Sequence, residues 1–175
     1  YSEQLHLEER EIVKNNCFKL TEKGNSNSMV LLGMLYEEEL DVDSAEKYYL
    51  LSIQQNNNPL AIFIIASLYR INGNLDLAEK YYLESVEQNN SISMYELGTL
   101  YLRKENRELA KKYYLQAVEH NNVNAIANLG LLYEIEGNKE LAKKFYLIAT
   151  EAKCSEAMYN LGCLYHEEKN TELEQ

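Results

Sequence analysis

Apolar side chains recur along this chain at intervals of three and four residues, in paired segments separated by short polar stretches. The segment 91–104 carries apolar residues at positions 92, 94, 95, 97, 100 and 101, a spacing typical of an amphipathic helix. A second such segment follows Asn106, and its apolar residues are Leu109, Ala110, Tyr113, Tyr114, Ala117 and Val118. The pattern therefore predicts a hairpin of two helices.

This hairpin pattern repeats at a fixed period. A Leu-Tyr pair recurs at a first step of 33 residues and then steps of 32, with its tyrosine at Tyr36, Tyr69, Tyr101, Tyr133 and Tyr165. Nine residues after the first four of these tyrosines stand Ala45, Ala78, Ala110 and Ala142. Such a period predicts an all-α solenoid of antiparallel helix pairs, in which each repeat buries its apolar face against its neighbours.

The repeats predict one helical domain over residues 1–175. We expect complete repeats at 26–57, 58–90, 91–122 and 123–154. Residues 8–25 form a degenerate N-terminal helix in register with the second helices, through Ile12, Val13, Cys17 and Leu20. Residues 155–175 form an incomplete repeat, with a first helix over 155–168 and one turn of its partner. Because the chain does not begin with Met, we expect a processed product or a fragment, followed by further repeats or another domain.

Polar residues recur at the predicted helix ends. Asp and Asn favour helix N-caps because their side-chain oxygens accept first-turn N–H groups. They precede each second helix, at Asp41, Asn74, Asn106, Asn138 and Asn170. Asn also tolerates the left-handed conformation of a helix C-cap. Asn pairs follow the second helices at positions 56–57, 89–90 and 121–122, and Pro59 suits the first turn of the next helix.

One position of the first helix always carries a small residue: Gly33, Ala66, Gly98, Gly130 and Gly162. Glycine inside a helix costs up to ~1 kcal/mol relative to alanine, so its recurrence predicts a close approach of the partner helix. The second helices carry the aromatic pairs 48–49, 81–82, 113–114 and 145–146, which we interpret as core residues.

The residues that follow this register resemble a known family. Leu129, Gly130, Tyr133, Ala142, Tyr146 and Ala149 resemble the tetratricopeptide repeat pattern. The junction QAVEHNNVNAIANLGLLYE is similar to that of Sel-like repeats, although the insertion that those repeats carry inside the hairpin is absent. The resemblance covers residues 8–175. It implies a right-handed superhelical solenoid whose first helices line a concave groove for peptides or partner helices.

Composition and charge exclude several classes of function. The net charge of −11 disfavours nucleic acid and anionic membrane surfaces as partners, because both need clustered Lys and Arg. No apolar run is long enough for a transmembrane helix. Three cysteines without repeat spacing do not predict a disulfide framework, so we expect a reducing compartment: the cytoplasm, or a host cytoplasm after delivery.

No catalytic or cofactor chemistry is predicted. Cys163 and His166 lie one helical turn apart, but structural zinc needs four ligands and no third group orients the histidine as a base. The glycines form no phosphate-binding loop. The acidic runs 37–39 and 167–168 lack the loop spacing of calcium ligands, and we interpret them as solvated. We expect neither an enzyme nor a bound cofactor or metal.

The register assigns residues to the groove that the resemblance implies: Val30, Leu31, Met34, Phe63, Ile64, Tyr95, Thr99, Leu102, Asn128, Leu131, Tyr159 and Asn160. Arg70 and Arg103 lie near its rim, too few cations for a clamp on a partner's carboxylate. For Asn128 and Asn160 two roles stay open, bonding a peptide backbone or serving local structure. We expect a scaffold that binds a protein or peptide, favouring a basic one. The alternative is a structural spacer or oligomerisation module that self-associates through its C-terminal end.

Overall fold

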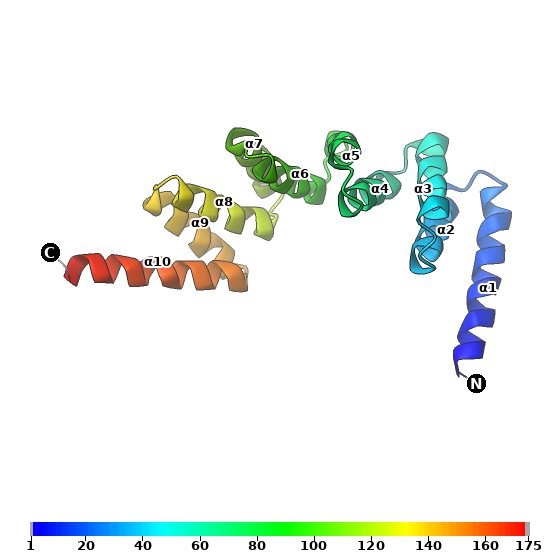
Figure 1. Cartoon of the computed structure of the whole chain (residues 1–175), viewed down its shortest axis with the longest axis horizontal. Coiled ribbons are helices and arrows are strands. Elements are labelled where there is room, and N and C mark those ends of the chain that lie inside the picture. Colours follow the sequence, from blue (N-terminus) through cyan, green and yellow to red (C-terminus); the bar gives the residue numbers. More distant parts are fainter. Residues whose placement is uncertain (1, 174–175) are drawn as a thin grey trace. The chain divides into compact units, whose positions relative to one another are not determined.

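The computed structural model describes the backbone of residues 2–173 and the side chains of residues 8–167 and 169. Every regular element in this part of the chain is an α-helix. Figure 1 shows the ten helices in chain order, with each hairpin partner beside its neighbour. The fold class predicted from the apolar pattern is therefore confirmed, and the helices fall into two compact units, one before and one after residue 88.

The first unit contains one helix without a hairpin partner and two complete hairpins. The unpaired helix is α1 (Ser2–Thr21). The hairpins are α2 (Ser26–Glu38) with α3 (Val42–Asn56), and α4 (Pro59–Ile71) with α5 (Leu75–Glu87). Helix α1 packs on α2, and α3 packs on α4. Arg10 and Lys14 of α1 form ion pairs with Glu38 and Glu39 at the end of α2.

The second unit contains two hairpins and then a single helix. The hairpins are α6 (Ser91–Arg103) with α7 (Arg107–Glu119), and α8 (Val123–Ile135) with α9 (Lys139–Glu151). Helix α10 (Ser155–Leu173) packs on α9 and contacts α8. In the second unit, a hydrophobic core joins α8, α9 and α10. Its buried residues include Ile126, Ala142, Tyr146, Ala149, Leu161 and Leu164.

The end of α10 differs from the prediction. Asn170 was predicted to cap a second helix, but α10 continues through this residue to Leu173. In the four complete hairpins a residue with positive φ precedes the cap, at Leu40, Gly73, Glu105 and Gly137. A turn of this kind is stabilised by packing of the helix that follows it. A segment of only a few residues is too short to form a stable helix there. Continuing α10 keeps its backbone hydrogen bonds instead.

The predicted caps are confirmed at the other four second helices. The side chains of Asp41, Asn74, Asn106 and Asn138 accept hydrogen bonds from backbone N–H groups three residues later, at 3.1–3.2 Å. Two consecutive asparagines divide two tasks at each junction, and at the first junction they are Asn57 and Asn58 rather than the predicted pair 56–57. Asn57, Asn89 and Asn121 take positive φ values of 52–60°, whereas the residue after each is the N-cap of the next helix. Each short junction therefore ends one helix and begins another.

In three of the four complete hairpins a tyrosine ring lies on a glycine. A Cβ added to Gly33, Gly98 or Gly130 would lie 2.4–2.6 Å from the ring of Tyr49, Tyr114 or Tyr146, and these three rings are fully buried. The first aromatic of each pair instead stacks on the repeat's Leu-Tyr tyrosine, as Tyr113 does on Tyr101 at 5.5 Å between ring centroids. The sequence predicted that the small residue lets two helices approach closely. In the structure, the space it leaves is filled by an aromatic ring of the partner helix.

Candidate binding face

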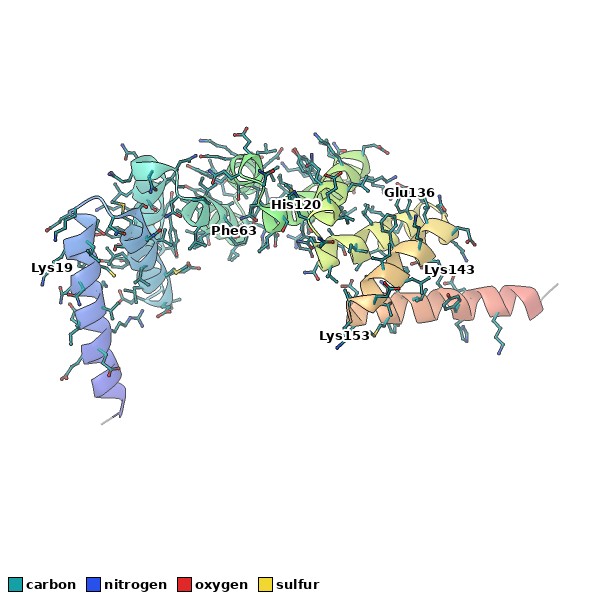
Figure 2. The ribbon with its side chains drawn as sticks, turned by 180° about the vertical axis from the view of Figure 1, so that it is seen from behind. Lys19, Phe63, His120, Glu136, Lys143 and Lys153 are labelled. Atoms are coloured by element: carbon teal, nitrogen blue, oxygen red, sulfur yellow. The ribbon has the colours of Figure 1, made fainter. Side chains whose placement is uncertain are left out.

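The first helices carry a row of mostly half-buried side chains, with Tyr159 as an exception at 72% exposed. Within the first unit, Leu31 and Met34 belong to α2 and Phe63 and Ile64 to α4 (Phe63 is labelled in Figure 2). Within the second unit, the row contains Tyr95, Thr99 and Leu102 on α6, Asn128 and Leu131 on α8, and Tyr159 and Asn160 on α10. We call these the first-unit face and the second-unit face.

One predicted residue does not reach the surface. Val30 is only 3% exposed and belongs to the core. Phe63 and Tyr95 occupy the equivalent repeat position, and their longer side chains extend from the same covered base to half-exposed positions. A short β-branched side chain at this position stays covered, so Val30 cannot serve as a surface anchor.

The first-unit face is mostly apolar. Leu31 is 40% exposed, and Met34, Phe63 and Ile64 are half-buried. The ring of Phe63 lies against that of Tyr82, 6.4 Å between centroids. Asn58, the N-cap of α4, donates to Asn27 Oδ1 of α2 at 2.9 Å, which ties the beginnings of the two helices together. The face is therefore built on helices whose ends are joined by side-chain hydrogen bonds.

The second-unit face carries polar groups that are held by tyrosine hydroxyls. Tyr114 is buried, and its hydroxyl lies 3.2 Å from Thr99 Oγ1 and accepts from Asn128 Nδ2 at 3.1 Å. One repeat later, Tyr146 donates to Glu134 at 2.6 Å. Asn128 therefore serves local structure through its amide nitrogen. Among the described residues, no hydrogen bond to the carboxamide oxygen of Asn128 accompanies this bond from its nitrogen.

Burial sets the ionisation of these tyrosines. It raises the pKa of Tyr114, although the hydrogen bonds with Thr99 and Asn128 act in the opposite direction. Burial is also the largest cause of the raised pKa of Tyr146, and the neighbouring Glu134 carboxylate raises it further. Because a neutral phenol can donate as well as accept, these hydroxyls remain fixed hydrogen-bonding groups at the edge of the face.

Several of the charged groups predicted near the rim are engaged within the chain. Arg70 Nε donates to Tyr82 Oη at 3.2 Å. Glu37 accepts from Tyr49 at 2.8 Å, and its two acidic neighbours pair with α1. Glu167 pairs with Lys139 at 3.2 Å, whereas the side chain of Glu168 lies outside the described residues. The run 37–39 was predicted to be solvated, and all three glutamates are exposed, with surface ion pairs from Glu38 and Glu39 to α1.

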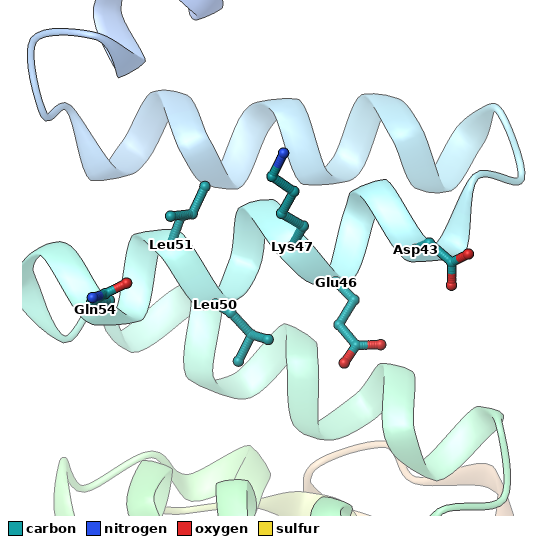
Figure 3. Close-up of a pocket in the computed structure, with 6 residues that line it drawn as sticks. All are labelled: Asp43, Glu46, Lys47, Leu50, Leu51 and Gln54. Carbon is teal, nitrogen blue, oxygen red and sulfur yellow. The ribbon is translucent and has the colours of Figure 1, made fainter.

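Neither a metal centre nor an enclosed pocket emerges among the described residues. No three His, Cys, Asp or Glu side chains there gather as metal ligands. A hollow of about 470 Å³ on α3 is lined by Asp43, Glu46, Lys47, Leu50, Leu51 and Gln54. Figure 3 shows that these side chains come from one helix, with Lys47 and Leu51 pointing to one side and Glu46 and Leu50 to the other. They do not converge on a common point.

Family comparison decides the class of the chain. The tetratricopeptide repeat model matches residues 61–92, 91–122 and 123–153, which together span more than half of the chain. The chain belongs to the tetratricopeptide repeat family. The Sel1 repeat model matches residues 26–57 and 155–171, so both resemblances noted in the sequence are confirmed. Repeats of these families generally mediate protein–protein interaction and are typically not enzymes.

Solved structures agree with this assignment. A protective antigen of uropathogenic Escherichia coli strains, which displays an SLR fold, matches with a TM-score of 0.75 and 25% identity. The match covers 89% of this chain but only 36% of the antigen, so this chain spans about a third of that protein. YrrB, a TPR protein with an unusual peptide-binding site, matches at a TM-score of 0.68 and 21% identity, over 88% of this chain and 84% of its own.

A further solved structure extends the likeness along the chain. BtubC from P. vanneervenii matches at a TM-score of 0.74 and 18% identity, over 97% of this chain and 85% of its own. At such identities the likeness shows the fold alone. No curated protein matches the sequence. Within residues 2–173, none of the helices combines the length and apolar character needed to cross a membrane.

Sequence reasoning missed the tyrosine hydroxyls as part of the face. Each buried tyrosine follows the small residue of its hairpin by sixteen positions, as in Gly130 and Tyr146. In two repeats a hydroxyl residue stands fifteen positions before the tyrosine, Ser67 before Tyr82 and Thr99 before Tyr114, and both pairs are in contact. This spacing was present in the sequence, but its meaning depends on knowing which ring lies over which helix.

Proposed function

We propose that this chain is a protein-interaction module whose first-helix faces bind an extended or helical segment of a partner protein. The observation that carries the proposal is the arrangement around Tyr114, where Thr99 and Asn128 of two successive first helices bond one buried hydroxyl. Polar groups fixed in this way lose little freedom on binding, and such pre-organisation favours affinity.

The first-unit face supplies apolar anchor sites in this proposal. Large apolar side chains that pack in partly covered positions are frequent anchors of protein interfaces. Phe63 fits this description, because its ring is half-buried and supported by Tyr82. Leu31, Met34 and Ile64 extend the apolar surface within the same unit. A partner segment would place aliphatic or aromatic side chains against them.

The second-unit face supplies hydrogen bonds to the backbone of the partner. The carboxamide oxygen of Asn128 can accept from a peptide N–H while its nitrogen remains bonded to Tyr114. YrrB, which shares the fold, carries a peptide-binding site, and this supports the choice of a peptide ligand for a chain of the same architecture. The net charge of −11 favours a basic segment through faster association, so binding weakens as salt increases.

The experiment begins with peptides selected from a displayed library on the purified chain. Calorimetric titration of a selected peptide then compares the wild type with Phe63→Ala and Asn128→Ala. We expect Phe63→Ala to weaken binding by about 2 kcal/mol or more, as for an interface anchor. Asn128→Ala should weaken it by about 0.5–1.5 kcal/mol, the contribution of a neutral hydrogen bond.

Two control variants separate binding from folding. Leu147→Ala removes an exposed aliphatic side chain from α9, a second helix, and should leave binding unchanged. Thr99→Val is the matched control for Asn128→Ala. Both variants remove one hydrogen-bonding partner of Tyr114, but only Asn128→Ala also removes the carboxamide oxygen proposed to accept from the peptide. Wild-type affinity in folded Phe63→Ala and Asn128→Ala would reject these faces as the binding site.

A further inference from the structure

The turn between α4 and α5 contains the single Asn-Gly pair of the sequence, Asn72-Gly73. Asn72 is the C-cap of α4, and both residues of the pair are exposed. Gly73 has a φ of +79°, and no heavy atom lies within 4 Å of the position that an added Cβ would take. The backbone at Gly73 is therefore accessible to solvent and unhindered by a side chain of its own.

The hydrogen bond made by the Gly73 N–H is longer than that of the residue that follows. Gly73 N–H donates to the Arg70 carbonyl at 3.2 Å, whereas Asn74 N–H donates to the Tyr69 carbonyl at 2.8 Å. The carboxamide of Asn72 makes no hydrogen bond to another described residue. Exposed hydrogen bonds at helix ends open at low free energy. Local opening can therefore release the Gly73 nitrogen while the rest of the hairpin stays folded.

An opened Asn-Gly pair has a defined reaction with water. The Gly73 nitrogen attacks Cγ of Asn72, its proton leaves with the carboxamide nitrogen as ammonia, and a cyclic succinimide forms. Glycine favours this attack because it has no Cβ to hinder the approach. Water then adds to either ring carbonyl and breaks the bond of that carbonyl to the Gly73 nitrogen. The products are aspartate, or isoaspartate with the main chain lengthened by a methylene group.

In two other repeats the position of Asn72 carries a carboxylate that is paired with a lysine. Glu39 and Glu136 are the equivalent residues. Glu39 binds Lys14 of α1 at 2.7 Å, and Glu136 binds Lys111 of α7 at 2.7 Å. The residue at this turn therefore meets one fixed position of the helix that precedes the hairpin.

At the junction of α3 and α4 that fixed position carries an acid. Glu46 stands where the two lysines stand and points toward α4 (Figure 3). Its carboxylate accepts a hydrogen bond from the Tyr69 hydroxyl at 2.6 Å, one helical turn before Asn72. A neutral carboxamide at position 72 is compatible with Glu46. By the same register, a carboxylate at position 72 faces a second carboxylate.

We propose that Asn72 is a deamidation site, and that its conversion to aspartate or isoaspartate weakens the packing of α3 on α4 by opposing Glu46. A negative charge at the C-terminal end of α4 is also unfavourable to the helix dipole. Isoaspartate in addition lengthens the turn that positions Asn74, the N-cap of α5. The site lies in a hairpin turn and not on the first-helix faces, so the inference is independent of the proposed function.

The first test follows the folded wild-type chain during incubation at mildly alkaline pH. Peptide mapping by mass spectrometry reports the mass gain of deamidation at each asparagine and separates aspartate from isoaspartate. Asn25 and Asn90 are internal controls, because each precedes a serine and accepts a backbone hydrogen bond through its side-chain oxygen. We expect Asn72 to convert first and to give both products. Earlier conversion of Asn25 or Asn90, or an Asn72 that reacts only in urea, would overturn the assignment of the site.

The second test isolates the charge at position 72. Asn72→Asp supplies the aspartate product directly, and Asn72→Lys gives the position the opposite charge. Both are compared by urea unfolding in the wild-type background and in the Glu46→Gln background. Glutamine can still accept from the Tyr69 hydroxyl, so the background variant retains that hydrogen bond. The effect of the helix dipole is common to both backgrounds, and the difference between them measures the interaction with Glu46.

We expect Asn72→Asp to raise the unfolding equilibrium constant roughly 1.5- to 5-fold more with Glu46 than with Glu46→Gln, the range of an exposed charge pair. Asn72→Lys should show a difference of the opposite sign. Deamidated wild-type chain should unfold at a lower urea concentration than fresh chain. Equal effects of Asn72→Asp in the two backgrounds, or equal urea midpoints of fresh and deamidated chain, would overturn the weakened junction. Failure of peptide binding at the first-helix faces would change none of these results.

Discussion

The contact between Gly130 and Tyr146 allows a sharp test of the hairpin geometry. A Cβ at Gly130 would lie 2.6 Å from both Cδ1 and Cε1 of Tyr146, and the ring is fully buried. At Gly162 the same added atom meets nothing within 4 Å. The variants Gly130→Ala and Gly162→Ala therefore add the same methyl group at the same repeat position. In Gly130→Ala the methyl group lies under the Tyr146 ring, whereas in Gly162→Ala it faces open space.

The expected magnitudes follow from two opposing effects. Alanine is favoured over glycine inside a helix by up to ~1 kcal/mol, a gain that both variants share. Overpacking in a filled core typically costs ~1–3 kcal/mol. Moving the ring also disturbs the hydrogen bond from Tyr146 to Glu134, which measures 2.6 Å. Gly162→Ala should therefore raise the free energy of unfolding by up to ~1 kcal/mol. The free energy of unfolding of Gly130→Ala should be ~1–3 kcal/mol lower than that of Gly162→Ala.

The second repeat shows how such a methyl group can be accommodated. Ala66 stands at the glycine position, and the hydroxyl of Tyr82 lies 3.1 Å from Ser67 and accepts from Arg70. Position 131, equivalent to Ser67, is leucine in the fourth repeat, so Tyr146 lacks this alternative partner. Urea unfolding followed by circular dichroism gives both free energies. Equal shifts of the same sign in Gly130→Ala and Gly162→Ala would refute the ring-on-glycine geometry.

Three further predictions concern caps, turns and pH. Asn106→Ala should destabilise the fold by about 0.5–2 kcal/mol in urea unfolding, the usual loss for an N-cap, whereas the exposed Lys144→Ala should have little effect; equal losses would remove the assigned helix start. Gly137→Ala should lower the melting temperature although its Cβ meets no atom, because φ is +79° and a side chain there costs roughly 1–2 kcal/mol; an unchanged melting temperature would contradict this. Burial raises the pKa of Tyr49, Tyr69 and Tyr146 in the folded chain above the free value of about 10. Their contribution to stability is therefore complete below about pH 10 and declines as the pH rises beyond it, so phenolate absorbance and unfolding should appear together in an alkaline titration. Tyrosines that ionise while the helical signal stays unchanged would argue that the rings are not buried.

The sequence predicts local features of this fold well. Caps depend on one side chain and the backbone within three residues, so Asp41 and Asn106 could be assigned from their register alone. The left-handed asparagines were predictable for the same reason, since the requirement lies in the residue itself. The Asn170 prediction failed because the register specifies where a cap can form, but the turn also needs a packed second helix after it.

The candidate faces were only partly predictable. Helical register places Phe63, Tyr95 and Val30 at one equivalent position, but exposure depends on side-chain length, and Val30 is covered. The roles of Asn128 and Lys111 depend on contacts between successive repeats. Asn128 reaches Tyr114, and Lys111 pairs with Glu136 at 2.7 Å beneath the ring of Tyr133, so neither is simply a solvent-facing residue. Contacts of this kind follow from how one hairpin stacks on the next, which the register alone does not give.

Hydrogen exchange of the chain with and without a selected peptide tests the proposed function most directly. Slowed exchange reports where a partner covers or stabilises the backbone. The account predicts that peptide-dependent protection is strongest in α2, α4, α6, α8 and α10, the helices that carry the two faces. Protection strongest in α3, α5, α7 and α9, or none at a saturating concentration of peptide, would contradict binding at the first-helix faces.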